Sequence, residues 1–162
     1  MRNWVDANPE DYNAKLELAN YLVLAGEQDK AVPLWESVLA VSPEHWVVLT
    51  NLSDALKNSD PERSLDYAER AYKLNPGYAP IALTLAEALL ANSKEPDRAI
   101  MLASSVTKRL PDNVSAGMLL ARAQFQNGDA EKARQTLEDL RTKKLAPGES
   151  EEIDTLLQQF SR

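Results

Sequence analysis

The sequence contains no cysteine and only one histidine, His45. The lack of cysteine excludes disulfides, thiol nucleophiles and thiolate-ligated zinc or iron–sulfur sites. A single histidine excludes a metal site with several histidine ligands and a catalytic histidine pair. Glycine (5) and proline (9) are also scarce, which argues against long loops. No apolar run reaches the roughly 18 residues that a membrane-spanning helix needs. The N-terminal stretch MRNWVDANPED also lacks the apolar segment of a secretion signal.

The remaining composition is that of an ordinary globular chain with an acidic balance. The 162 residues are 44% hydrophobic and 27% charged, which argues against disorder. At roughly 150 residues per domain, this length predicts one compact unit. The formal net charge of −7 disfavours nucleic acid and anionic membrane surfaces as partners.

Prolines recur at a nearly constant spacing along the chain. Pro9, Pro43, Pro76, Pro111 and Pro147 stand 34, 33, 35 and 36 residues apart, and most of them follow a helix-like run. A period near 34 predicts an array of repeated helix–turn–helix units. Equivalent residues also form columns, the later ones at the helical spacing i, i+4, i+7. These columns are Leu18-Ala19, Leu52-Ser53, Leu85-Ala86 and Leu120-Ala121, followed by Ala31/Trp35/Val38, Ser64/Ala68/Ala71, Ala99/Ala103/Val106 and Ala133/Leu137/Leu140.

This pattern resembles the tetratricopeptide repeat, in which a large and then a small residue of helix A let helix B pack closely. The resemblance covers about residues 9–147 and is clearest over 18–43 and 119–140. The chain departs from the family at Ser64, where Ala is usual, and at Gln124, where Tyr is usual. The early helix A position also lacks its usual Trp. The resemblance implies an all-α, right-handed α-solenoid of about four helix pairs.

The periodicity also predicts where the elements lie. We expect helices over residues 11–25, 28–41, 44–58, 61–74, 78–92, 95–110, 113–127, 130–144 and 150–160. The four repeats would span about 12–45, 46–78, 79–113 and 114–147, within an array over 10–147.

The two ends of the chain carry further expectations. Residues 1–9 match the end of a helix B and predict the remnant helix of a preceding repeat, in which Trp4 is a packing residue; a natural cap is the alternative. Residues 148–162 predict a capping helix with Ser150 as its N-cap. Its apolar stripe, which would cover the end of the fourth repeat, consists of Ile153, Leu156, Leu157 and Phe160.

No arrangement of residues indicates catalysis. His45 lies at a boundary between repeats, where repeat geometry offers no nucleophile on a strained turn. Carboxylate pairs such as Glu10/Asp11 and Glu151/Glu152 stand at expected helix starts, where the helix dipole favours acids. The sequence has no glycine-rich phosphate loop and no GxSxG motif. It therefore predicts a protein that is not an enzyme and that uses no cofactor or metal.

Two of the tryptophans have different expected environments. Trp35 stands in the large-residue column of helix B and is expected in the core. Part of the apolar run Trp46–Val48, at the start of a helix A, is expected to be exposed.

The family resemblance implies a concave face lined by the A helices. If the usual groove positions carry over, the centre of the groove is acidic and amide-rich and its ends are apolar. Chaperone-binding members of the family hold a terminal carboxylate with cations, which Leu16, Pro80 and Thr84 replace here, so such a ligand is disfavoured. The expected partner is therefore a basic and apolar protein or peptide segment. The expected partner-binding residues are Asn20, Asn51, Asp54, Leu83, Glu87, Leu90, Met118, Arg122 and Phe125.

The sequence thus predicts a non-catalytic scaffold that binds a protein or peptide segment in this groove. A narrower resemblance is to the tetratricopeptide repeat lipoproteins associated with bacterial exopolysaccharide export. It is carried by Leu49, Asn51-Leu52 and the stretch 67–72, whereas residues 85–87 depart from the usual Leu-Gly-Trp. This resemblance implies that the protein is periplasmic or membrane-anchored and belongs to an envelope assembly. If the resemblance does not hold, a cytoplasmic location is expected.

Several alternatives stay open at this point. Tetratricopeptide repeat proteins of cytochrome c maturation and pilus assembly are alternatives to the export family. A second hypothesis is that the chain is a regulatory or docking module of a larger enzyme whose catalytic domain lies outside it. A third hypothesis is a self-associating array whose exposed ends stack. Neither nucleic acid nor direct membrane insertion is expected.

Overall fold

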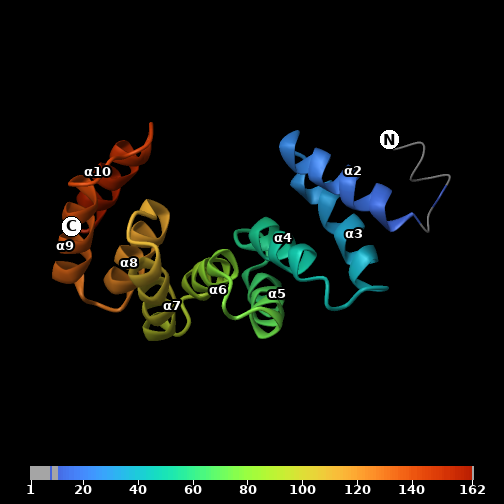
Figure 1. The fold of residues 1–162 in the computed structure, drawn as a ribbon, viewed down its shortest axis with the longest axis horizontal. Helices are drawn as coiled ribbons and strands as arrows, with labels where there is room; N and C mark the ends of the chain where they lie inside the picture. Colours follow the sequence, from blue (N-terminus) through green and yellow to red (C-terminus); the bar gives the residue numbers. More distant parts are fainter. Residues whose placement is uncertain (1–7, 9–10, 162) are drawn as a thin grey trace. The chain divides into compact units, whose positions relative to one another are not determined.

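The computed structural model describes residue 8 and residues 11–161, and the regular elements within them are all helices. They are α2 (Tyr12–Leu24), α3 (Gln28–Leu39), α4 (Trp46–Leu56), α5 (Pro61–Leu74), α6 (Ala79–Ala91), α7 (Pro96–Arg109), α8 (Val114–Gln126), α9 (Ala130–Arg141) and α10 (Glu149–Gln159) (Figure 1). No strand occurs in this part of the chain, which confirms the predicted all-α class. The predicted remnant helix over 1–9, with Trp4, lies outside the described residues except for Asn8.

The helices form two compact units that divide between Asn75 and Pro76. The single unit expected from the chain length was therefore wrong. Each element of a repeat array contacts only its neighbours, so no common core has to hold the whole chain together. Within the units, the helices pack as the pairs α2–α3, α4–α5, α6–α7 and α8–α9, each joined by a short turn (Figure 1).

Small buried residues allow the two helices of each pair to approach closely. Ala19 and Ala31 in the first pair, like Ala121 and Ala133 in the last, are completely buried. Close backbone packing with few voids supplies the dispersion contacts that stabilise a helical core.

The two departures from the family pattern at Ser64 and Gln124 are explained by hydrogen bonds between paired helices. The Ser64 hydroxyl donates to the Ser53 carbonyl at 2.8 Å, and the two hydroxyl oxygens lie 3.2 Å apart. In the last pair, the Thr136 hydroxyl donates to Gln124 Oε1 at 2.8 Å. These polar residues therefore join helix A to helix B at the positions where Ala and Tyr are usual in the family.

The missing large residue of helix A is also compensated in the fourth repeat. A Cβ atom added to Gly117 would lie 2.6 Å from Leu140 Cδ2, so the leucine from α9 fills the space over this glycine. Leu140 itself is buried.

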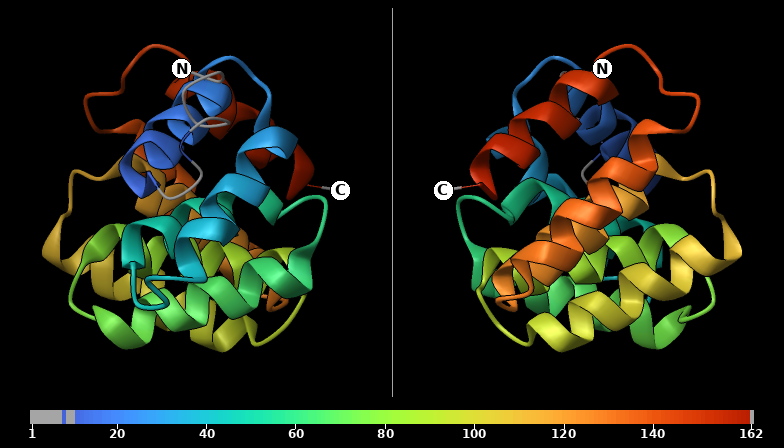
Figure 2. Two further views of the ribbon diagram at one scale, coloured as in Figure 1. Left: turned by 90° about the vertical axis from the view of Figure 1, so that its right-hand side faces the viewer. Right: turned by 90° about the vertical axis from the view of Figure 1, so that its left-hand side faces the viewer.

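The C-terminal helix α10 packs against α9 and α8 (Figure 2, right). Its Ile153, Leu156 and Phe160 join a buried cluster with residues that include Met118 and Leu137. The predicted N-cap at Ser150 was wrong, because α10 begins at Glu149 after Gly148. Gly148 has a φ of 89°, a left-handed conformation that glycine adopts without the steric cost that a Cβ would bring.

Candidate functional site

In the first unit, α2, α3 and α4 surround a pocket of about 330 Å³, which we call the α2–α4 pocket. Asn20 comes from α2, whereas Asn51 and Asp54 come from α4. Asn20 lies 31 residues before Asn51 in the sequence, and the fold brings it to one pocket with the two α4 residues. Its remaining lining consists of Val23, Leu24, Gln28, Trp35 and Ala55.

Trp35 forms part of the wall of the α2–α4 pocket. Its side chain is only 2% exposed, which confirms its expected place in the core. The buried indole Nε1–H has no hydrogen-bond partner among the described residues. A buried polar group without a partner costs about 1–3 kcal/mol, so the pocket wall contains an unsatisfied donor. No sequence signal indicates that this core residue also lines a pocket.

In the second unit, a smaller pocket of about 240 Å³ lies beside α6, α8 and α10, and we call it the α10 pocket. Leu90, Arg122 and Phe125, all predicted site residues, line it together with Gln126. The contribution of the C-terminal segment was not predicted from the sequence: Leu156 and Gln159 of α10 and its C-cap residue Phe160 also line this pocket.

An aromatic pair ties α10 to this pocket. The rings of Phe125 and Phe160 are stacked, with centroids 4.2 Å apart and an interplanar angle of 11°. Phe160 follows Phe125 by 35 residues, and Ile153 follows Met118 by the same interval. This spacing, which continues the register of the A helices into α10, is the signal that would have identified Phe160.

The remaining predicted residues lie apart from both pockets or are buried. Leu83 and Glu87 on α6 are half-buried and line neither pocket. Met118 is 6% exposed because it belongs to the cluster beneath α10. Leu90 does line the α10 pocket, but it is only 4% exposed. The surface available to a partner is therefore smaller than the set of nine predicted residues implies.

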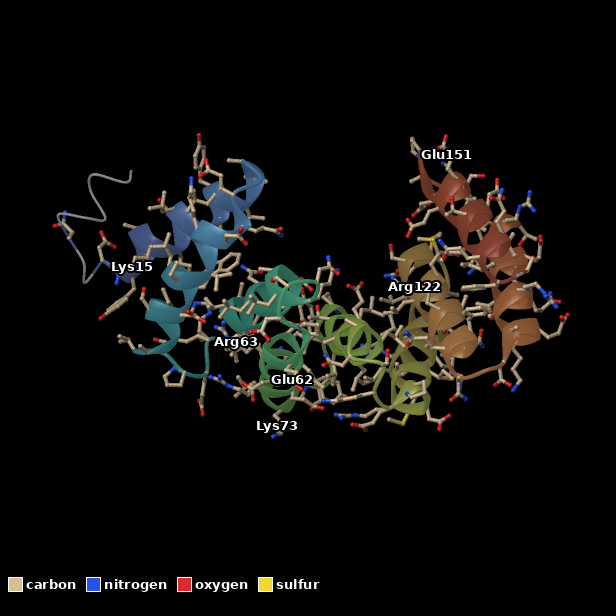
Figure 3. All side chains as sticks on the ribbon, turned by 180° about the vertical axis from the view of Figure 1, so that it is seen from behind. Lys15, Glu62, Arg63, Lys73, Arg122 and Glu151 are labelled. Atoms are coloured by element: carbon tan, nitrogen blue, oxygen red, sulfur yellow. The ribbon has the colours of Figure 1, made fainter. Side chains whose placement is uncertain are left out.

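The two pockets carry charges of opposite sign. Asp54 is the charged residue that lines the α2–α4 pocket, whereas Arg122 is the charged residue that lines the α10 pocket. Figure 3 shows Arg122 projecting outward from α8. Each pocket therefore favours a different kind of side chain.

The described part of the chain offers no group of three or more histidine, cysteine, aspartate or glutamate residues placed to hold a metal ion. His45 is the N-cap residue of α4, and its side chain makes no capping hydrogen bond. Trp46 and Val47 are exposed and Val48 is fully buried, as the sequence predicted for this run. Within residues 11–161, no helix combines the length and the apolar character needed to cross a bilayer.

Two family models, both described as tetratricopeptide repeat, match residues 49–103 and 93–159. None of the curated proteins matches the sequence. Among solved structures, MamA from Desulfovibrio magneticus (its residues from 41 to the end) is 17% identical, with a TM-score of 0.71 over 81% of this chain and 74% of that one. A thermophilic tetratricopeptide repeat protein from Thermus thermophilus is 19% identical, with a TM-score of 0.72 over 92% and 80%.

A third similar structure is YrrB, described as a tetratricopeptide repeat protein with an unusual peptide-binding site. It is 14% identical to this chain, with a TM-score of 0.69 over 86% of this chain and 72% of YrrB. At these identities the three likenesses concern the fold.

Proposed function

Because the chain belongs to the tetratricopeptide repeat family, we propose that it is a non-catalytic scaffold that binds a segment of a partner protein on its A helices. Tetratricopeptide repeats are in general protein–protein interaction modules, and this chain has their architecture of paired helices. The finer proposal is that the bound segment carries basic and apolar side chains.

The observation that carries this proposal is the convergence of Asn20, Asn51 and Asp54 on the α2–α4 pocket. A side-chain amide offers both donors and an acceptor, which match the carbonyl and N–H groups of a peptide backbone. The Asp54 carboxylate favours a cationic side chain, because hydrogen bonds between ionised groups are stronger than neutral ones. Val23 and Leu24 supply apolar wall on which an aliphatic stem can pack.

The likeness to YrrB supports a peptide as the class of ligand. YrrB is described as having a peptide-binding site, and its fold matches 86% of this chain. The proposal carries over only the class of ligand, since the two sequences share 14% identity.

The test uses a phage-displayed library of random dodecapeptides selected on the full chain. The dissociation constant of each selected peptide is then measured by fluorescence anisotropy. We expect Asp54→Lys to weaken binding roughly tenfold at low salt and less at high salt, because an exposed charge acts mainly through screened electrostatics. Asn51→Ala should also weaken binding, because the backbone hydrogen bonds are lost.

Asp66→Lys is the matched control, since it reverses an exposed carboxylate on α5 that does not line the pocket. Selected peptides whose affinity is unchanged by both pocket variants would refute the α2–α4 pocket as the site. Failure to select any peptide would refute the scaffold function in this form.

We also propose, from the sequence likeness to the export-associated lipoproteins, that the scaffold works in a bacterial envelope or exopolysaccharide export assembly. The support is the stretch 67–72 together with Leu49 and Asn51-Leu52. Deleting the gene should reduce the amount of secreted polysaccharide, and the wild-type gene should restore it. Unchanged secretion in the deletion strain would refute this assignment.

A further inference from the structure

Arg122 differs from the other arginines that the structure describes. Each of those six has an ion-pair or hydrogen-bond partner: Glu36 for Arg63, Asp66 for Arg70, Glu95 for Arg98, the Gly77 carbonyl for Arg109, Glu131 for Arg134 and Glu138 for Arg141. Arg122 is exposed and makes neither kind of bond with any described residue. In a chain with a formal net charge of −7, acidic groups are in excess, yet none pairs with this guanidinium in the described structure.

Arg122 lines the α10 pocket, and the other residues of this lining are mainly uncharged. The α10 pocket contains no acidic residue, and two glutamines, Gln126 and Gln159, supply its other polar side chains. Gln126 is held in place, because its Nε2 donates to the Leu90 carbonyl at 3.2 Å. Phe125, which is 38% exposed and stacked on Phe160, provides the apolar surface next to the cation.

We propose that the α10 pocket binds an acidic side chain of the partner segment, with Arg122 as the residue that recognises its carboxylate. The proposal rests on the proposed scaffold function and adds a second, oppositely charged contact to it. A guanidinium can bind a carboxylate through two parallel N–H···O bonds, and the methylene groups of aspartate or glutamate can pack on Phe125.

The size and charge of the pocket favour this occupant. A volume of about 240 Å³ suits one side chain. One guanidinium balances one carboxylate, whereas it leaves part of the charge of a phosphate group, about −1.5 to −2 near neutral pH, unbalanced. The lining also contains no carboxylate that would repel the ligand.

The charge expected at the α10 pocket differs from the charge expected at the α2–α4 pocket. Net charge and Asp54 favour a basic segment at the α2–α4 pocket, whereas the lining of the α10 pocket favours an acidic side chain. The side chains that contact the two pockets are therefore expected to have opposite signs.

The experiment uses the peptides selected on the full wild-type chain and measures their binding to variants of Arg122. Peptides selected on the wild type should contain a shared Asp or Glu, and Arg122→Gln should weaken their binding roughly tenfold, as expected when one member of a charge pair is removed. Arg122→Glu should weaken the binding of these peptides further, because two negative charges then face each other. A peptide whose shared acid is changed to Lys should bind the Arg122→Glu variant again. Arg134→Gln, which removes an equivalent charge on α9 outside the pocket, is the control and should leave affinity unchanged.

Each other outcome identifies what failed. If Asp54→Lys weakens the binding of the peptides but Arg122→Gln does not, the scaffold function stands and the proposed contact between Arg122 and an acidic side chain is wrong. If amidating the peptide C-terminus abolishes binding while replacing the internal acid does not, the carboxylate is terminal, and the proposed side-chain contact is wrong. If neither Asp54→Lys nor Arg122→Gln alters affinity, both the α2–α4 site and the acidic contact fail.

Discussion

The buried serine pair between α4 and α5 provides the sharpest test of the packing. The Ser64 hydroxyl donates to the Ser53 carbonyl, so the hydroxyl hydrogen of Ser53 is left to meet Ser64 Oγ at 3.2 Å. Ser53 is 1% exposed and Ser64 is fully buried, so water cannot replace either bond. We predict that removing the Ser64 hydroxyl alone destabilises the protein and that removing both hydroxyls does not.

The magnitude follows from which group is left without a partner. Ser64→Ala leaves the Ser53 hydroxyl buried and unpaired, a loss of about 1–3 kcal/mol. The higher helix propensity of alanine offsets about 0.5 kcal/mol of this. We therefore expect a net loss of about 1–2 kcal/mol. The double variant Ser53→Ala/Ser64→Ala removes both polar groups and should be nearly neutral, since apolar replacement of both partners leaves no unmet group.

The other three repeats contain the alanine version of this contact. Ala19 with Ala31, Ala86 with Ala99 and Ala121 with Ala133 occupy the equivalent positions, and all six are completely buried. The double variant therefore gives the second repeat the residues that the fold already accommodates elsewhere in the chain.

Urea unfolding of the four proteins of this double-mutant cycle is the assay. Trp35 and Trp46 belong to the first unit, which contains the serine pair, so their fluorescence follows the unfolding of that unit. With an m-value of about 2 kcal/mol/M, which is typical of small proteins in urea, the midpoint of Ser64→Ala should fall by roughly 0.5–1 M. If the losses of unfolding free energy in the two single variants add up to the loss in the double variant, the hydroxyls do not stabilise each other. A double variant less stable than Ser64→Ala would show the same.

Three further predictions concern the second unit. Deleting residues 150–162 should lower the melting temperature measured by circular dichroism, because it uncovers the apolar cluster beneath α10; an unchanged melting temperature would contradict this packing. Gly117→Val should lower the free energy of unfolding by about 1–3 kcal/mol, since its side chain would overlap Leu140, whereas Ser115→Val at an exposed site of the same helix should cost less than about 1 kcal/mol. Phe125→Ala should reduce the binding free energy of the selected peptides by about 1–2 kcal/mol, because its exposed ring is expected to contact the peptide directly. Fluorescence anisotropy measures this change, and an unchanged dissociation constant would exclude that role.

Most of the fold was predictable because the same local pattern is repeated. Each helix pair places a large and a small residue in fixed columns, so one uncertain segment is identified from three equivalent ones. Single positions without such support were less predictable. Ser150 is of a residue type that is common at N-caps, but the N-cap of α10 is Gly148, two residues earlier, where glycine adopts a positive φ.

The site was only partly predictable because repeat position does not determine exposure. Met118 and Phe125 both belong to α8, and their groove positions predicted that both bind a partner. Met118 is covered by α10, whereas Phe125 keeps part of its ring exposed beside Phe160. The sequence identified α10 as a cap but gave no reason to treat a capping residue as part of a pocket.

The preference for a basic partner shows a limit of averaging charge over a chain. Net charge governs long-range steering, which decays within about 10 Å at 0.1 M salt. Selectivity at contact depends instead on the few groups that line a pocket, and Arg122 gives the α10 pocket the opposite sign to the chain as a whole. Salt should therefore slow association driven by the overall charge, while the acid preference of the α10 pocket should persist as long as the guanidinium contacts the carboxylate directly.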